Sequence, residues 1–95
     1  MTITTNRGQE FKVNWAWADE ETGILRIELP DTRTIGEIAE DFDGLGKIER
    51  KSEEEGDKVY MGYNVLSRVI RNIEKGTVQL TMEKNAVLSP SRKEA

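Results

Sequence analysis

The side chains of this sequence that could bind or react are mainly carboxylates. The chain contains no cysteine and no histidine. Thiol nucleophiles and Ser-His or Cys-His catalysis therefore cannot be built, and a tetrahedral zinc site would lack its usual ligands. Carboxylate, lysine or tyrosine chemistry is still open, as is a metal site built from oxygen ligands.

The acidic residues gather in three segments, which we treat as candidate partner-binding residues. They are Asp19, Glu20, Glu21, Glu37, Glu40, Asp41, Asp43, Glu53, Glu54, Glu55 and Asp57. Asp41 with Asp43, or Glu53 with Glu55, could form an acid–base pair or bind Mg²⁺. Nothing in the pattern buries such a pair or places a nucleophile beside it. We therefore expect a protein that is not an enzyme and that uses no cofactor or metal.

Charge is distributed unevenly along the chain. The formal net charge is −4, but residues 31–57 carry ten acids and four bases, whereas residues 58–95 carry three acids and seven bases. Carboxylates repeated along a helix and a loop can imitate phosphates and occupy a basic groove that normally binds DNA or RNA. The alternative is a solvated acidic face that only keeps a small domain soluble.

The basic residues of the last third allow other interpretations. They are Lys58, Arg68, Arg71, Lys75, Lys84, Arg92 and Lys93. These side chains could hold nucleic acid or a nucleotide phosphate. No glycine-rich phosphate loop accompanies them, and the acidity of the whole chain argues against direct DNA binding. Pairing with the acidic middle, within the fold or between copies, is a better use of these charges and would allow homo-oligomers.

Four aromatic residues, Trp15, Trp17, Tyr60 and Tyr63, could line a ligand pocket. Their spacing is typical of strand residues that face a core, and we favour that interpretation. Trp17 lies at a strand end beside an acidic loop, so it is the aromatic side chain that we expect at the surface.

Alternating apolar residues predict β-strands in the first third of the chain. Residues 2–5 are predicted to form a short strand. Residues 9–17 alternate with period two, which predicts one half-buried strand. Its apolar side would hold Phe11, Val13, Trp15 and Trp17. Residues 24–29 are predicted to pair with it as a hairpin. The buried side of that strand would hold Leu25, Ile27 and Leu29.

One helix is predicted after these strands. Thr34 and Glu37 have the spacing of a capping box, in which the Thr hydroxyl and the Glu carboxylate each bind a free backbone N–H. The residues of the apolar helix face are Ile35, Ile38, Ala39 and Phe42. Asp43 and Gly44 end the helix. A helix of about two to three turns is marginal alone, so its apolar face must pack on a sheet.

The second half of the chain is predicted to be mostly strand. Residues 45–51 form a strand around Ile48, and residues 52–57 form a charged loop. The next strand alternates at Val59, Met61 and Tyr63. The glycine at position 62 interrupts it, which is typical of a bulge or of a close approach by another segment.

The last elements are a hairpin. Residues 65–73 fit either a helix or a twisted strand, and we favour the strand because a turn follows at Lys75-Gly76. The apolar side of the final strand would hold Val78, Leu80 and Met82. Residues 85–95 lose this periodicity and are predicted to be a flexible tail.

These elements predict an α+β fold, in which a curled antiparallel sheet of about five to seven strands packs on one short helix. Residues 1–84 would form a single domain. No apolar run approaches the length of about 18 residues that spans a bilayer. The first residues lack the basic flank and apolar core of a signal peptide, so we expect a cytoplasmic location.

Several strings in the chain support a resemblance to a group of known proteins. They are residues 27–29 with Asp31 and Arg33, residues 37–44, residues 48–52, residues 55–57, Gly62-Tyr63, Leu66 and residues 76–81. In these segments the chain resembles small uncharacterised proteins encoded by prophages of gut Firmicutes, over roughly residues 2–84. The resemblance brings no catalytic residue. It implies a phage or mobile-element product in a bacterial cytoplasm.

That context gives two hypotheses for function. In the first, the protein inhibits a host defence system as an anti-CRISPR protein does, by placing its acidic surface in the basic groove of a bacterial nucleic-acid-binding effector. In the second, it is a small virion component or a tail or head assembly factor, and its polarised charge drives oligomerisation. A third interpretation, binding of a phosphorylated signalling nucleotide, would require Arg68 or Arg71 to face a pocket.

Overall fold

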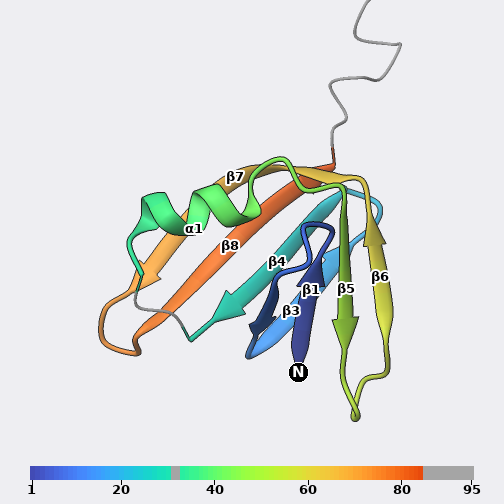
Figure 1. Cartoon of the computed structure of the whole chain (residues 1–95), viewed down its shortest axis with the longest axis horizontal. Helices are drawn as coiled ribbons and strands as arrows, with labels where there is room; N and C mark the ends of the chain where they lie inside the picture. The colour runs from blue at the N-terminus through green and yellow to red at the C-terminus, as the bar shows by residue number, and fades with distance from the viewer. Residues whose placement is uncertain (31–32, 85–95) are drawn as a thin grey trace, which may run out of the picture.

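The structure is a computed structural model that describes residues 1–30 and 33–84. Within these residues lie eight β-strands and one α-helix (Figure 1). They are β1 (Thr2–Thr5), β2 (Glu10–Lys12), β3 (Trp15–Asp19), β4 (Ile24–Leu29), α1 (Ile35–Phe42), β5 (Lys47–Lys51), β6 (Lys58–Met61), β7 (Tyr63–Asn72) and β8 (Thr77–Lys84). The tail predicted at residues 85–95 lies outside the described residues.

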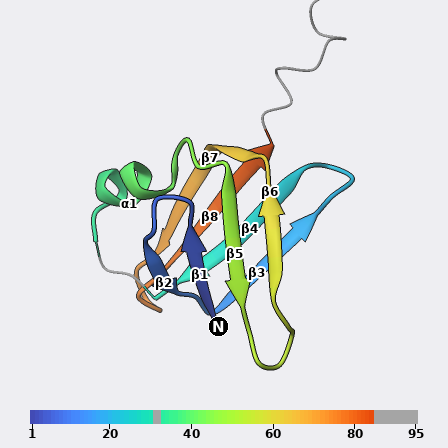
Figure 2. The same cartoon turned by 45° about the vertical axis from the view of Figure 1, so that its right-hand side comes forward.

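The strands form two antiparallel sheets rather than one. Sheet 1 has the order β2-β1-β5-β6, and sheet 2 has the order β3-β4-β8-β7. Figure 2 shows the strands of sheet 1 crossing obliquely in front of those of sheet 2. The α+β class is confirmed, but our expectation of a single sheet with about five to seven strands is wrong. Two of the predicted strands bend, and each of them supplies one strand to each sheet.

The facing sides of the two sheets form the core. Sheet 1 contributes Ile3, Ile48 and Tyr60, all buried. Sheet 2 contributes Leu25, Ile27 and Leu29 from β4, and Val78, Leu80 and Met82 from β8, each at most 1 % exposed as the alternation predicted. Burying one side chain of this size stabilises a fold by about 1.5–3 kcal/mol, so these layers dominate the stability.

The first corner between the sheets corrects the strand predicted at residues 9–17. β2 ends before Val13, and β3 begins at Trp15 in the other sheet. Val13 and Ala16 are both buried although they are three positions apart, so the alternation slips by one residue at the corner. Trp15 and Trp17 therefore face outward. Trp17 is 52 % exposed, which confirms the surface position expected for it.

The second corner lies at Gly62, between β6 and β7. We expected Val59, Met61 and Tyr63 to share a buried side, but Val59 and Met61 are 51 % and 59 % exposed, whereas Tyr60 and Tyr63 are buried. Gly62 has φ +85° and its N–H donates to the carbonyl oxygen of Gly46 at 2.8 Å. A left-handed residue between the two tyrosines turns the chain from one sheet into the other. Nothing approaches the position of a Cβ at Gly62 within 4 Å, so the glycine serves the turn and not a close contact.

The helix packs against β7, and the segment after it covers the first part of that edge of sheet 2. The predicted capping box is confirmed, because Thr34 Oγ1 accepts from Glu37 N–H and Glu37 Oε1 accepts from Thr34 N–H. The following segment covers the start of β7, where Gly44 N–H donates to Asn64 O at 2.9 Å and Leu66 N–H donates to Asp43 Oδ1 at 3.2 Å. These bonds satisfy part of an otherwise open strand edge. β7 itself runs over Tyr63–Asn72, so the strand interpretation of residues 65–73 is confirmed.

The apolar faces of α1 are only partly buried. Ile38 and Phe42 are fully buried, as predicted, but Ile35 at the start of the helix is 48 % exposed.

Among the described residues no helix is long and apolar enough to cross a membrane.

The conformation of Gly62 gives a stability prediction. Because its φ is +85° and a Cβ would meet open space, Gly62→Ala should cost only the left-handed backbone penalty of about 1–2 kcal/mol. Urea unfolding followed by tryptophan fluorescence measures this loss. Gly36→Ala in α1 is the matched control, since Gly36 lies in a right-handed helix, and it should not destabilise the protein. Equal effects of the two substitutions would contradict the assignment.

Candidate functional site

The turn between β5 and β6 carries the densest group of acidic side chains. We call residues 52–57 the acidic turn. It holds Glu53, Glu54, Glu55 and Asp57. Figures 1 and 2 show this turn extending beyond the ends of the other strands. The three glutamates are exposed to solvent. The acidic turn is therefore a projecting, negatively charged tip of sheet 1.

Hydrogen bonds hold the acidic turn in one shape. Ser52 Oγ accepts from Glu55 N–H at 3.0 Å, and Asp57 Oδ1 accepts from Ser52 N–H at 3.3 Å. Arg50 lies beneath, with its side chain only 11 % exposed. Its Nη2 donates to the carbonyl oxygens of Glu55 and Gly56 at 3.2 Å, and its Nη1 donates to the hydroxyl of Tyr60 at 3.0 Å. Arg50 thus ties the turn to the core, while the three glutamates stay exposed to solvent.

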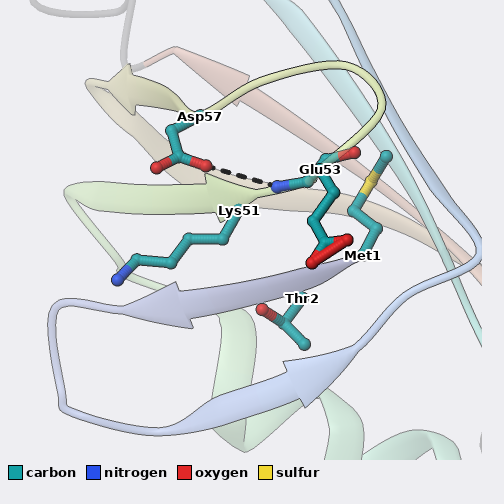
Figure 3. A pocket seen from close by; sticks show the side chains of 6 residues that line it. Met1, Thr2, Lys51, Glu53 and Asp57 are labelled. Atoms are coloured by element: carbon teal, nitrogen blue, oxygen red, sulfur yellow. Dashed lines mark hydrogen bonds between the residues drawn. The ribbon is translucent and has the colours of Figure 1, made fainter.

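A wide hollow lies beside the acidic turn on sheet 1. Its volume is about 500 Å³, and it is lined by Met1, Thr2, Lys51, Ser52, Glu53 and Asp57. Figure 3 shows Glu53 beside Met1 on one side of the hollow and Lys51 with Asp57 on the other. Glu53 and Asp57 are both exposed, so their carboxylates stay solvated and lack the burial that adapts a carboxyl to general acid catalysis.

The acids of α1 are mostly engaged in holding the fold. Glu37 closes the capping box, and Asp43 accepts from the backbone of β7. Asp41 lies between Arg33, with which it forms an ion pair, and Gln9, whose Nε2 donates to Asp41 Oδ1 at 3.1 Å. Glu40 is exposed, and no bond to its carboxylate is found among the described residues.

Arg7 explains how an acidic helix with no basic residue in its last turn is stabilised. Its Nη1 donates to the carbonyl oxygen of Glu40 at 2.7 Å, and its Nη2 donates to that of Asp43 at 2.6 Å. These carbonyls are the free acceptors at the C-terminal end of the helix, where the helix dipole also favours a cation. Arg7, which lies in the β1–β2 turn, therefore supplies the positive charge and the hydrogen-bond donors that the last turn of α1 lacks.

The electrostatic surroundings of Asp41 change its acidity. Burial alone would raise the pKa of this carboxyl, but hydrogen bonds from Arg33 and Gln9 and the positive charges of Arg33 and Arg7 outweigh it. The pKa of Asp41 is thus held below its ordinary value of about 3.8. The ionised side chain of Asp41 thus links α1 to Arg33 and Gln9.

The loop after β3 holds the third group of acids. Asp19 Oδ1 accepts from Glu21 N–H at 3.0 Å and so closes the turn. Glu20 lies 3.7 Å from Lys58 Nζ. Glu21 is exposed. In Figure 1 this loop, α1 and the acidic turn lie at three different corners of the molecule. The predicted site residues are thus not brought together into one continuous surface.

Sequence reasoning missed two further features of the surface. The outward side of sheet 2 carries Trp17 on β3 directly beside Arg26 on β4, and Arg68 faces Thr81 in the same cross-strand row. Lys58 and Lys84 line a small pocket together with Tyr60 and Tyr63. The alternation of residues 24–29 already indicated the outward position of Arg26. No sequence signal brings Lys58 and Lys84 together.

Binding of a signalling nucleotide would require Arg68 or Arg71 to face a pocket, and these two arginines lie in different surroundings. Arg68 is exposed on the outward side of sheet 2, whereas Arg71 borders an open hollow at the end of β7 with Ile70 and Ile73. Within residues 1–30 and 33–84, no three potential ligand side chains are grouped in a way that could hold a metal ion.

Comparison of the chain with models of protein families, with curated proteins and with solved structures found no match.

The low pKa of Asp41 predicts an acid-sensitive contribution to stability. Asp41→Asn should lower the free energy of unfolding at pH 7 by about 1 kcal/mol, because it removes one charge from a hydrogen-bonded ion pair at a partly exposed position. The difference from the parent protein should be complete above the unfolded-state pKa of about 3.9 and should disappear as the pH falls through the lower folded-state pKa.

Urea unfolding at several pH values between 2 and 7 tests this expectation, with Glu40→Gln as the matched control on the exposed side of the same helix. A difference between Asp41→Asn and the parent that stays constant down to pH 2 would show that the charge of Asp41 is not what stabilises this contact.

Proposed function

We propose that this protein is a non-catalytic binding protein whose acidic turn occupies a basic nucleic-acid-binding groove of a bacterial effector. The observation that carries the proposal is the combination of projection, charge and rigidity in residues 52–57. Three consecutive glutamates are exposed at the tip of a hairpin, and Arg50 fixes the backbone beneath them.

Rigidity matters because binding a flexible loop loses the entropy of ordering it. The acidic turn is held by the side chains of Arg50, Ser52 and Asp57 before any partner is present. The backbone of the turn therefore needs no reorganisation when its carboxylates meet lysine and arginine side chains. Charge complementarity of this kind mainly raises the association rate and the specificity, and it weakens with added salt.

The charge of Arg50 does not cancel that of the turn. Its side chain is only 11 % exposed, and its guanidinium donates to backbone carbonyls and to Tyr60. Its contact with Glu55 Oε1 is long at 3.8 Å. The carboxylates of Glu53 and Glu54 have no hydrogen bond or ion pair among the described residues. A partner would thus meet at least two free carboxylates and a third that is only weakly paired.

The other acidic groups contribute less in this proposal. Three of the four acids on and after α1 hold the fold, as does Asp19 in the loop after β3. Glu40 and Glu21 could extend the contact to a large partner. The resemblance to prophage-encoded proteins suggests which partner this is, namely a host defence effector of the CRISPR type, which holds a nucleic-acid duplex in a positively charged channel.

A role in virion assembly is the second candidate, and exposed apolar side chains favour it. Val59 and Met61 lie on the edge strand β6, and Ile70 lies on the edge strand β7, each between 46 % and 59 % exposed. Open edges with apolar side chains can pair between copies. Size-exclusion chromatography with light scattering separates the two: a ring-sized oligomer favours assembly, and a monomer or dimer favours the inhibitor.

Charge reversal tests the inhibitor proposal. Glu53→Lys/Glu54→Lys should weaken inhibition of DNA binding by a CRISPR effector by about tenfold, equivalent to about 1.4 kcal/mol. The measurement is fluorescence polarisation of labelled target DNA with each effector at increasing concentrations of the protein and at several salt concentrations. Glu10→Lys/Glu74→Lys is the matched control, because it changes the net charge equally at exposed positions outside the turn. Equal potency of the two double variants would show that the acidic turn is not the binding element.

Loosening the turn without changing its charge is a separate prediction. Arg50→Lys keeps the positive charge but loses the paired contacts to Glu55 and Gly56, because lysine cannot reproduce the planar fork of arginine. The turn should become mobile on the nanosecond timescale by ¹⁵N relaxation, and inhibition should fall several-fold. Unchanged inhibition by a mobile turn would contradict the role of rigidity.

A further inference from the structure

A small pocket lies where sheet 1 meets the loop after β3. It is formed by β6, the end of β8 and that loop, which lie close together in Figure 2. Lys58 and Lys84 line it together with the rings of Tyr60 and Tyr63, and Glu20 stands at its side. The pocket is distinct from the acidic turn, and a binding role for the pocket does not depend on the function proposed above.

The two lysines give the pocket an excess of positive charge. Lys58 Nζ lies 5.6 Å from the ring centroid of Tyr60, and Lys84 Nζ lies 5.4 Å from that of Tyr63. Lys58 is paired with Glu20 at 3.7 Å. Lys84 has no ion-pair partner among the described residues. A carboxylate thus already approaches one ammonium group, and the other ammonium group is free to bind an anion.

The tyrosines form a fixed wall below these ammonium groups. Their rings meet edge to face with centroids 6.3 Å apart, and Arg50 anchors the hydroxyl of Tyr60. Tyr63 is 2 % exposed, and its buried hydroxyl has no hydrogen-bond partner among the described residues. Burial, with the negative charge of Glu20 nearby, raises the pKa of Tyr63. The phenol therefore stays protonated and keeps an O–H that can donate to an acceptor.

The size of the pocket limits the ligand. Its volume of about 180 Å³ equals that of about six water molecules, at about 30 Å³ for each. Pockets for drug-sized ligands measure about 300–1,000 Å³, so a whole nucleotide would not be enclosed. A head group of a few heavy atoms fits, and the exposed side chains of Val59 and Met61 at the rim would contact whatever carries it.

We propose that this pocket binds a small oxyanion, the phosphate or carboxylate head of a ligand, between Lys58 and Lys84, with Glu20 as the internal group that the ligand displaces from Lys58. The apolar rim at Val59 and Met61 then accepts the remainder of the ligand. Neither lysine is needed for the core, because each ammonium group lies at the surface above a ring that the core itself holds in place.

Titration of the full-length protein with inorganic phosphate, and separately with acetate, tests the proposal by ¹H–¹⁵N NMR at constant ionic strength. Shifts should saturate and concentrate on β6, the end of β8 and the loop after β3. Lys84→Gln should weaken the affinity at least fivefold, whereas Lys12→Gln, an exposed lysine on β2, should leave it unchanged. Tighter binding of phosphate than of acetate assigns a phosphate head group, and tighter binding of acetate assigns a carboxylate; equal binding shows that the pocket accepts either head group.

Glu20, which would compete with the anion for Lys58, supplies a second test in which the affinity should rise. Glu20→Gln should raise the affinity for the anion several-fold because it frees Lys58, whereas Glu21→Gln makes the same change of charge one residue away and should have little effect. Shifts that do not saturate, or that respond equally to Lys84→Gln and Lys12→Gln, would overturn the proposal. So would equal effects of Glu20→Gln and Glu21→Gln.

Discussion

Each sheet has one apolar face, and the burial of these two faces against each other is the constraint on which the rest of the structure depends. A chain of 95 residues cannot build two separate cores. The two sheets therefore share one core, and the chain passes from one sheet into the other at two corners, residues 13–14 and Gly62. At each corner the alternation slips by one residue, so that the next buried side chain lies three positions further on: Ala16 follows Val13, and Tyr63 follows Tyr60. The outward faces of β3 and β6 follow from these two shifts.

Arginine side chains connect this core to the acidic segments around it. Arg7 binds the carbonyls at the end of α1, Arg33 pairs with Asp41, and Arg50 binds the carbonyls of the acidic turn. In each case a cation on one element orders the backbone or a carboxylate of another. Part of the negative charge in the middle of the chain is thus paired within the fold. The glutamates that are left free gather most densely at residues 53–55, which is why the proposed binding function rests on the turn and not on the helix.

The two proposed sites carry opposite charges, and both adjoin β6. The acidic turn presents carboxylates from a tip that Arg50 holds from below, and the pocket presents the ammonium groups of Lys58 and Lys84 above two tyrosines. Tyr60 belongs to both, since its hydroxyl binds Arg50 and its ring lies beneath Lys58.

Local patterns in the sequence were enough to determine the elements whose residues interact mainly with their own neighbours. The capping box at Thr34 and Glu37, the buried sides of β4 and β8, and the turn that carries Glu53–Glu55 could all be predicted, because alternation and capping are properties of a few consecutive residues. The exposure of Trp17 also followed from its place at a strand end.

Only the tertiary structure decided where the alternation of buried and exposed residues slips, which acidic side chains are paired within the fold, and which basic side chains lie close together. The division of residues 9–17 and 58–72 between two sheets depends on burying both apolar faces at once, and no short window of sequence contains that requirement. Asp41 is tied down by Arg33 and Gln9, and Lys84 comes beside Lys58 across 26 positions of the chain, because strand pairing brings distant segments together. The sequence by itself therefore determined that this small acidic chain carries free carboxylates on a turn and lacks the thiol and imidazole groups of common catalytic sites. The packing of the two sheets decided which of those carboxylates have no contact within the described part of the fold.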